Sequence, residues 1–577
     1  MRVKVFSLCF IGVLVGLAGC SQPAEQPAAP ATAPAAPKLG IKPFGTADAN
    51  FKPDYSKLPP ELQKTFAYID EHIDEHAENL RKWLQQPSIS NSGEGIPESA
   101  EMVKGFFEEL GCQDARVVET GITEYGSQGN PVVYAKCDEG APKTLAMWWM
   151  GDNMPITQPD NWIVPPFEAR VVDGATAVVP EASRVILARG ATNTKGPHMA
   201  QLNAIRSLKA VMGKLPVNLI FVVEFDEERM DIGLRKFFAD HSDLVQEADA
   251  LYRGEASEGC VYVELTTSGK SWGRGPVQSD IHGANMRTVD SVGWRHMHML
   301  ASLTSEDGNT PLIKGFFDNK ELPTPADVAR MKTQAATMDL VARAQNLGVA
   351  RFKWDDPYMV IKGGSFETSF NLDGIWGGNM YAGGAGAIMP NKITSKHNFR
   401  YVPRMNGLDI VKKLRAQIDA NGYKDVELKL IGDVPWSRAS SPDADISKAR
   451  RKGAEDLVAA GLVDAAPRTA AALTNSSEMN SYVEIEPTGG YWPAYLFSDA
   501  EVGQKVGTIS IPMGEGGAGG GIGGGGSRSH AANEYYTIEA VGKTEGLAYN
   551  EKSVAAALFE YSKITTTPPK PKTSAAK

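Results

Sequence analysis

Two short apolar runs that flank a helical stretch constrain the fold more than any other feature. Residues 144–150 (TLAMWWM) and 217–225 (VNLIFVVEF) are bounded by turn-forming residues, and residues 197–212 between them have a helical pattern. A strand, a helix and a strand in this order indicate a βαβ unit with parallel strands. We therefore expect an α/β fold with a mostly parallel sheet, whose polar sites lie at the carboxyl ends of the strands.

The remaining pattern predicts the layout of the chain. Further helices are expected over 60–84, 98–110, 408–421 and 553–563, and further strands over 393–402 and 506–512. The segment 276–430 differs in character from its surroundings and is expected to be an insert. The expected organisation is a signal peptide (1–20), an Ala/Pro-rich tether (21–59), a main domain in two parts (60–275 and 431–563), the inserted smaller α/β domain (276–430) and a disordered tail (564–577).

The N-terminus has the features of an exported lipoprotein. Basic residues precede an apolar run over 5–18, which is too short to span a bilayer as a mature helix. The sequence LAGC, which ends at Cys20, resembles the lipobox at which bacterial lipoprotein signals are cut and the new terminal Cys is acylated. The alternative is an ordinary signal peptide with an incidental Cys. Because Ser21 rather than Asp follows Cys20, the resemblance implies a lipid anchor in the outer membrane, facing the periplasm.

Composition excludes two classes of partner. The formal net charge is −10, so no basic surface for nucleic acid is expected. No second stretch of about eighteen apolar residues predicts a transmembrane helix, and membrane contact is expected through lipid alone. Cys112, Cys137 and Cys260 lack the CxxC spacing of metal sites and allow at most one disulfide. We expect buried free thiols, because a chain of this length has a large core without cross-links.

Five segments, far apart in the sequence, carry acidic, amide or His side chains at expected strand ends or in loops. They are MGDNMP (150–155), RGATNTKG (189–196), EFDEE (224–228), RGE (253–255) and RSHAANE (528–534). Taken singly, each has an ordinary interpretation: Glu227 and Glu228 as a solvated charge pair, His530 as a surface His. Their joint order is far more specific.

Together these segments resemble the carnosinase, aminoacylase and carboxypeptidase G family of co-catalytic zinc metallopeptidases, from about residue 62 to 563. Four further stretches match the same family: WIVPPF (162–167) followed by Asp173-Gly174, DIH (280–282), PNK (390–392) and RYVP (400–403). The resemblance implies an α/β catalytic domain with an inserted α/β lid. In many members this lid also forms the contact of a homodimer.

The resemblance assigns roles to individual residues. In this family a carboxylate and a hydroxide bridge two divalent ions, and a free Glu moves the proton of the attacking water. Glu227 matches that general base, Glu228 a ligand of one metal, Glu255 a ligand of the other, and His530 the remaining imidazole ligand. The residues of the lid are His282, which matches the group that stabilises the oxyanion, and Arg400, which matches the group that binds the carboxylate of the substrate.

Two positions depart from the family pattern. Met150 stands where the family has the His of its first metal motif, and Asn193 stands where it has the bridging Asp. The ion at Glu255 would keep that carboxylate and a neutral amide, because a thioether is too soft to replace imidazole on zinc. One divalent ion, zinc by resemblance, or none therefore fits the charges better than two, and the second ion is doubtful.

The other ion retains Glu228 and His530, with the side-chain oxygen of Asn193 as a weak third ligand. Asp152, which orients the missing His in the family, is either free to become a ligand or left as a structural acid. His198 is a candidate replacement imidazole, but we expect it in the first turn of the following helix instead.

The functional expectation is a metallopeptidase-type amidohydrolase. Its substrates would be dipeptides, short peptides or N-acyl amino acids with a free carboxylate. The alternatives are a pseudo-enzyme that binds a peptide or amino-acid derivative without turnover, as Met150 and Asn193 suggest, and a structural surface protein. The Gly-rich loop over 514–526 contains a formal GxGxxG but no P-loop Lys, which disfavours a dinucleotide site and favours a mobile loop over the substrate.

Overall fold

The structure is a computed structural model. It describes residues 38–45, 51–253, 257–347, 349–437, 444–463, 491–497, 509–514 and 526–565. Cys20, Glu255 and most of the Gly-rich loop lie outside the described residues. Among the helices that are described, none is long and apolar enough to cross a membrane.

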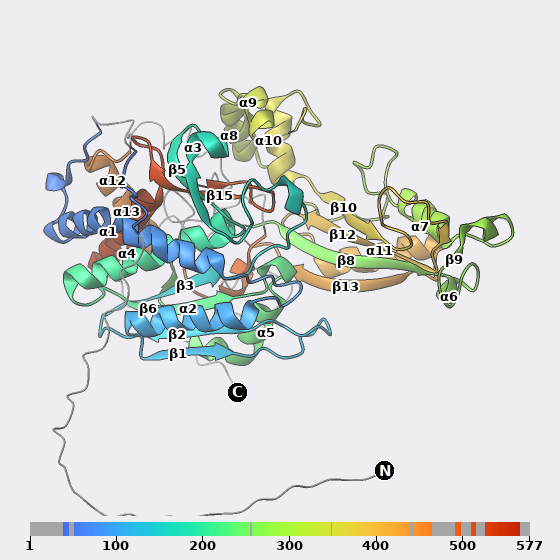
Figure 1. The fold of residues 1–577 in the computed structure, drawn as a ribbon, viewed down its shortest axis with the longest axis horizontal. Coiled ribbons are helices and arrows are strands. Elements are labelled where there is room, and N and C mark those ends of the chain that lie inside the picture. Colours follow the sequence, from blue (N-terminus) through green and yellow to red (C-terminus); the bar gives the residue numbers. More distant parts are fainter. Residues whose placement is uncertain are drawn as a thin grey trace, which may run out of the picture. The chain divides into compact units, whose positions relative to one another are not determined.

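The expected βαβ unit lies in a five-stranded sheet with the order β1-β2-β6-β3-β7. Its strands are β1 (Asp114–Val118), β2 (Val132–Cys137), β3 (Thr144–Met150), β6 (Asn218–Glu224) and β7 (Ala250–Leu251). β6 and β7 run parallel to β3, whereas β1–β2 and β2–β6 are antiparallel. The α/β class is confirmed, and the sheet is mixed, with its parallel pairs on either side of β3. Figure 1 shows β3, β6, β2 and β1 side by side.

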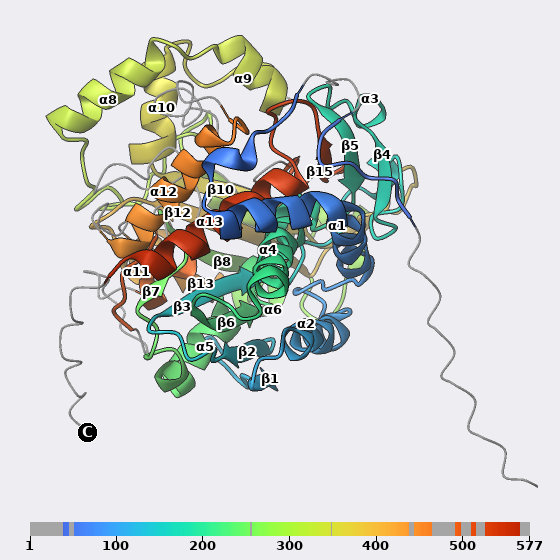
Figure 2. The same cartoon turned by 90° about the vertical axis from the view of Figure 1, so that its left-hand side faces the viewer.

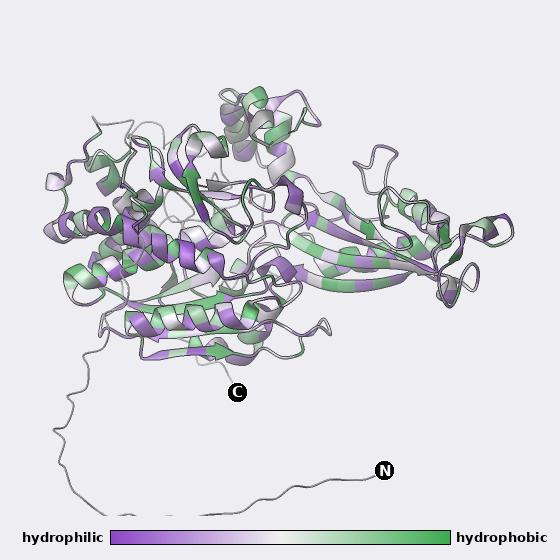
Figure 3. Cartoon of the chain, in the orientation of Figure 1, coloured by the Kyte–Doolittle hydropathy of each residue, from purple (hydrophilic) through white to green (hydrophobic). Residues whose placement is uncertain are grey.

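Helices cover both faces of this sheet. Side chains of β3 point alternately to the two faces, and those on each face are apolar and pack against helices. Met147 and Trp149 pack in the large core with α1 (Pro60–Gln85), α2 (Ile96–Leu110) and α4 (Gly196–Met212), whereas Ala146 packs with α5 (Ile232–His241). α12 (Asp445–Ala459) and α13 (Leu547–Lys563) join α1 and α4 (Figure 2). The central strand β6 is accordingly hydrophobic along most of its length, whereas the edge strand β1 (DARVV) is mixed, and α2 alternates between hydrophobic and hydrophilic residues (Figure 3).

A second sheet of the same body has the order β14-β15-β5-β4. Its strands are β4 (Arg170–Asp173), β5 (Ala182–Leu187), β14 (Gly526–Ser527) and β15 (Tyr535–Ala540), with α3 (Gly174–Ala177) between β4 and β5. All its neighbouring strands are antiparallel. The sheet brings the segment after β5 next to the segment before β15.

The third sheet, which we call the lid sheet, has the antiparallel order β10-β12-β8-β13. Its strands are β8 (Gly259–Ser268), β10 (Ser369–Trp376), β12 (Lys392–Tyr401) and β13 (Glu427–Val434). The other elements between β8 and β13 are α6 (Gly269–Trp272), β9 (Ile281–His282), the 3-10 helix η7 (Gly283–Arg287), α7 (Val292–Ala301), α8 (Pro325–Ala335), α9 (Leu340–Leu347), α10 (Pro357–Phe366), β11 (Ile388–Met389) and α11 (Gly407–Ala420). The sheet therefore includes β8, which precedes the expected insert.

Three findings differ from expectation. Residues 38–45 and 51–59, assigned to the tether, include groups that bond to the body: Ile41 N donates to Asp74 Oδ1 at 2.9 Å. Residues 509–512 form no strand in the described part of the expected strand over 506–512. Cys112 and Cys137 form a disulfide rather than free thiols, because the end of α2 and the end of β2 bring their Cα atoms within 4.0 Å. The expectation of a buried free thiol is confirmed for Cys260.

Candidate active site

The acidic residues gather where β3 and β6 end together. Met150 and Glu224 are paired in the parallel register, so the residues that follow them leave the sheet at the same edge. Asp152 comes directly after β3, and Glu227 and Glu228 lie in the short 3-10 helix η5 (Glu227–Arg229) after β6. The backbone N–H of Glu228 donates to Asp152 Oδ2 at 3.1 Å, which joins the two segments.

Asn193, Glu228 and His530 meet at one point. Asn193 lies in the turn η4 (Ala191–Lys195) before α4, and His530 lies in the loop before β15. Asn193 Nδ2 lies 2.9 Å from Glu228 Oε1 and 3.0 Å from His530 Nε2. His530 Nε2 in turn lies 2.9 Å from Glu228 Oε1. The three side-chain atoms form a triangle, and we call these residues the Asn193 cluster.

The electrostatics of the edge favour a cation. Burial, reinforced by Glu228, raises the pKa of Asp152 to about 7. Burial, again reinforced by Glu228, raises the pKa of Glu227 well above its usual value, against the opposing charge of Arg400. Burial alone would lower the pKa of His530, but the charge of Glu228 outweighs it and the net pKa is raised. Burial is the largest cause in each case, and the negative charge of Glu228 contributes to all three shifts, which a bound cation would offset.

The Asn193 cluster offers donor groups of the kinds that bind a divalent ion. A half turn of the Asn193 amide presents Oδ1 to the point where Glu228 Oε1 and His530 Nε2 converge, which gives one carboxylate, one imidazole and one amide oxygen. Asp152 Oδ1 is buried and has no hydrogen-bond partner of acceptable geometry among the described residues. Within those residues no three His, Cys, Asp or Glu side chains are spaced to hold a metal.

Arg400 is linked to Glu227 through Tyr491. It is near the end of β12, and its guanidinium lies 4.7 Å from the ring centre of Tyr491. The hydroxyl of Tyr491 donates to the backbone oxygen of Glu227 at 3.3 Å. Arg400 Nη1 also donates to Glu258 Oε1 at 3.2 Å, and burial raises the pKa of Glu258 to about 7 against the effect of Arg400. A cationic fork beside the expected general base suits the carboxylate of a substrate.

His282 is not brought to this edge within one chain. It is exposed on β9, and the neighbouring Asp280 accepts from the backbone of Asn391, which precedes β12. Arg400 is paired with Cys260 at the opposite end of the lid sheet. β8 spans this length in 10 residues, or roughly 30 Å, and Figure 1 shows β9 at the end of the lid far from β3 and β6.

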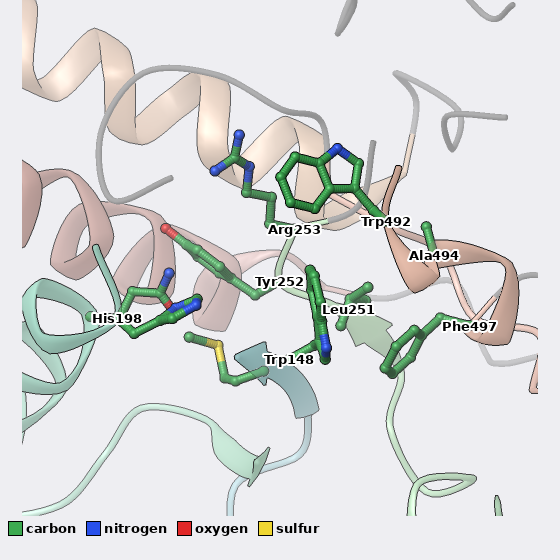
Figure 4. Close-up of a pocket in the computed structure, with 10 residues that line it drawn as sticks. Trp148, His198, Leu251, Tyr252, Arg253, Trp492, Ala494 and Phe497 are labelled. Carbon is green, nitrogen blue, oxygen red and sulfur yellow. The ribbon is translucent and has the colours of Figure 1, made fainter. Parts of the chain in front are cut away.

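His198 is in the first turn of α4, as expected, and its ring does not join the Asn193 cluster. Its Nε2 accepts from the backbone N–H of Met150 at 3.1 Å, and its ring stacks on Trp149 with a centroid distance of 5.4 Å. It lines a small cavity of about 30 Å³ with Trp148, Tyr252 and other side chains (Figure 4). Burial, together with the charge of Arg253, lowers the pKa of His198 to about 3, which disfavours a cation there.

Sequence reasoning missed two residues that contact the site. Tyr491 carries no motif, and its role depends on packing against segments far away in the chain. Glu258 is a single acid before β8, and nothing local marks it as the partner of Arg400. Glu255, expected as a metal ligand, lies outside the described residues.

Known proteins resemble the chain over most of its length. The human protein named Beta-Ala-His dipeptidase is 25% identical over 412 residues, which cover 66% of this chain and 77% of the relative. The Candida albicans Cys-Gly metallodipeptidase DUG1 is 23% identical over 498 residues, covering 80% of this chain and 92% of the relative.

The fold is shared with solved structures. The M20 family metallo-carboxypeptidase Sso-CP2 from Sulfolobus solfataricus superposes with a TM-score of 0.63 at 24% identity, over 85% of this chain and 99% of that chain. Peptidase family M20/M25/M40 matches residues 152–548, which contain Asp152, the Asn193 cluster, Glu227 and Arg400. The chain therefore belongs to the peptidase family M20/M25/M40.

Proposed function

We propose that the protein hydrolyses amide bonds in dipeptides, short peptides or N-acyl amino acids with a single divalent metal ion. The observation that carries this proposal is the Asn193 cluster beside the buried carboxyl group of Glu227. Glu228, His530 and the oxygen of Asn193 would hold the ion. Zinc is the metal proposed, because a mixed carboxylate and imidazole donor set suits it.

The side chains of the chain divide the reaction between them. A bound ion would supply the positive charge that polarises the scissile carbonyl. Glu227 takes the proton of the attacking water and delivers it to the leaving amine, which requires a carboxyl pKa raised towards neutrality. Asp152 holds the backbone of Glu228 and so keeps the segment after β6 in place.

Arg400 supports a substrate with a free carboxylate. Tyr491 contacts both the guanidinium of Arg400 and the backbone of Glu227, so a substrate carboxylate bound by Arg400 would lie on the same side of the site as the base. The relatives named as dipeptidases and the solved metallo-carboxypeptidase support the same substrate class, since short peptides carry such a carboxylate.

His282 would serve this reaction only from a second copy of the chain. Roughly 30 Å of lid sheet separates it from Arg400, so we propose a homodimer in which the lid of one copy reaches the site of the other. There an imidazole would meet the oxyanion of the tetrahedral intermediate.

We also propose that the protein is exported and held in the outer membrane, facing the periplasm, by lipid on Cys20. The disulfide between Cys112 and Cys137 supports an oxidising compartment. Palmitate labelling of the wild type, absent from Cys20→Ala, is the expected result, and equal labelling of both would contradict the anchor.

The test of the function is turnover of a panel of dipeptides and N-acyl amino acids by the zinc-loaded protein. The variant Glu227→Gln removes the base and is expected to lower kcat by about 10² to 10⁴. Glu78→Gln is the matched control, because Glu78 is also buried but is paired with Arg81 on α1, away from the site. No cleavage of any panel member by the zinc-loaded wild type would refute the proposal.

The second candidate is a pseudo-enzyme that binds such ligands without turnover. Met150 and Asn193 favour it, because they replace a metal ligand and the bridging carboxylate expected from the family. Equilibrium binding of a dipeptide that stays intact over a long incubation would support this candidate, and cleavage abolished by Glu227→Gln would exclude it.

A further inference from the structure

Glu534 is a buried carboxylate in the site region to which the reaction assigns no role. Its side chain has no exposure to solvent and accepts four hydrogen bonds. Oε1 accepts from the backbone N–H groups of Thr192 at 2.9 Å and Asn193 at 2.8 Å. Oε2 accepts from Arg189 Nη1 at 2.6 Å and from the backbone N–H of Gly190 at 3.1 Å.

The second sheet of the body explains how Glu534 reaches this turn. Tyr535 is paired with Leu187 in the register of β15 and β5, so Glu534 lies beside the residues that leave β5. The backbone N–H of Ala188 donates to the backbone oxygen of Glu534 at 3.1 Å. The side chain is thereby aimed at the turn that carries Asn193.

Arg189 extends the same arrangement to the other side of the Asn193 cluster. It forms a buried ion pair with Glu534, and its Nη2 donates to the backbone oxygen of His530 at 3.2 Å. One ion pair therefore bonds to the backbone of both Asn193 and His530. A buried carboxylate is costly unless every oxygen is satisfied, which makes this geometry specific.

We propose that Glu534, together with Arg189, is a positioning residue that sets the separation between Asn193 and His530 and so determines the affinity of the cluster for its metal ion. Both side chains are buried, with 2% of Arg189 and none of Glu534 exposed. The inference rests on the proposed function for the identity of the ligand, zinc, but its effect on the turn before α4 is independent of turnover.

The variant Glu534→Gln tests this role with little change of shape. Gln has one oxygen where the carboxylate has two, so its NH₂ group must face two of the four donors. We expect the turn over 190–193 to open more often and the affinity for zinc to fall about 10- to 100-fold, as for other groups that hold metal ligands in place. Glu534→Asp, which keeps both oxygens, should recover part of that affinity.

Glu539→Gln is the matched control. Glu539 is also buried on β15 and accepts from Arg184 Nε at 2.7 Å and Ser183 Oγ at 3.1 Å, but it contacts no residue of the Asn193 cluster. We expect this control to lower the melting temperature without changing zinc affinity, measured by competition with a chromophoric chelator. Hydrogen exchange of peptides covering 188–195 in the metal-free protein should accelerate for Glu534→Gln and stay unchanged for the control.

The outcomes separate this inference from the proposed function. Equal zinc affinity and equal exchange over 188–195 in both Gln variants would overturn the positioning role. If the wild type binds no zinc, the proposed function fails and the affinity claim with it, whereas the exchange measurement still reports whether Glu534 holds the turn. If Glu534→Gln does not fold, Arg189→Met removes the bond to His530 and is expected to lower zinc affinity in the same direction.

Discussion

Asn193→Asp places a second carboxylate where an amide now bridges Glu228 and His530. In the metal-free protein the new oxygen would lie about 2.9 Å from Glu228 Oε1, and the pair would relieve the repulsion by taking up a proton. A neighbouring carboxylate raises the pKa of a carboxyl group by at most about three units, which corresponds to a loss of at most about 4 kcal/mol at neutral pH. Protonated His530 offsets part of this loss, so we expect about 1 to 4 kcal/mol.

The loss of stability in Asn193→Asp should depend on pH. An acid whose pKa is raised on folding costs stability above that pKa, and the cost disappears as the pH falls towards its unfolded value of about 4. Urea unfolding with a chelator should therefore show a larger deficit for Asn193→Asp at about pH 7 than at about pH 5. With zinc bound, Asn193→Asp should be more stable than the wild type, because a carboxylate binds the ion better than an amide. An equal deficit at both pH values, or no extra gain from zinc, would refute this account.

Three further outcomes are expected. Arg400→Met should lower kcat/KM for a dipeptide about 10- to 100-fold but not for its C-terminal amide, and an equal loss on both would argue against a carboxylate at Arg400. Burial lowers the pKa values of His296 and His397 to about 4. Between about pH 4 and about pH 6.5 the folded lid therefore binds fewer protons than the unfolded chain. Acidification below about pH 6.5 should lower the free energy of unfolding, measured in urea, by up to about 3 kcal/mol per His. His397→Asn should flatten this dependence. Reducing the disulfide between Cys112 and Cys137, which are separated by 25 residues, should cost about 3 kcal/mol, and an unchanged melting temperature in reductant would contradict this.

Elements with a strong local pattern were predictable from the sequence. β3 and β6 are apolar runs bounded by turns, and α4 between them has helical periodicity, so their existence and parallel order followed directly. The proximity of Asp152 to Glu228 also followed, because the ends of neighbouring parallel strands share one edge of a sheet.

Contacts that depend on tertiary packing were not predictable. The order of the motifs along the chain does not give the distances between them in space. The resemblance therefore indicated a role for His282, but not that the full length of β8 separates it from Arg400. An odd number of cysteines left it undecided whether a disulfide forms. The packing of α2 on the sheet is what brings Cys112 and Cys137 together. The contacts of Glu534 were also not predictable, because the sequence placed this residue in the motif around His530 but assigned it no role.

The proposed function depends on one divalent ion, held by the Asn193 cluster in place of the family's pair. The most direct test is the zinc content of the purified protein, measured by mass spectrometry after removal of loosely bound metal, beside the double variant Met150→His and Asn193→Asp. We predict at most one ion in the wild type and two in the double variant, which restores the missing imidazole and the bridging carboxylate. Two ions in both proteins would contradict the account.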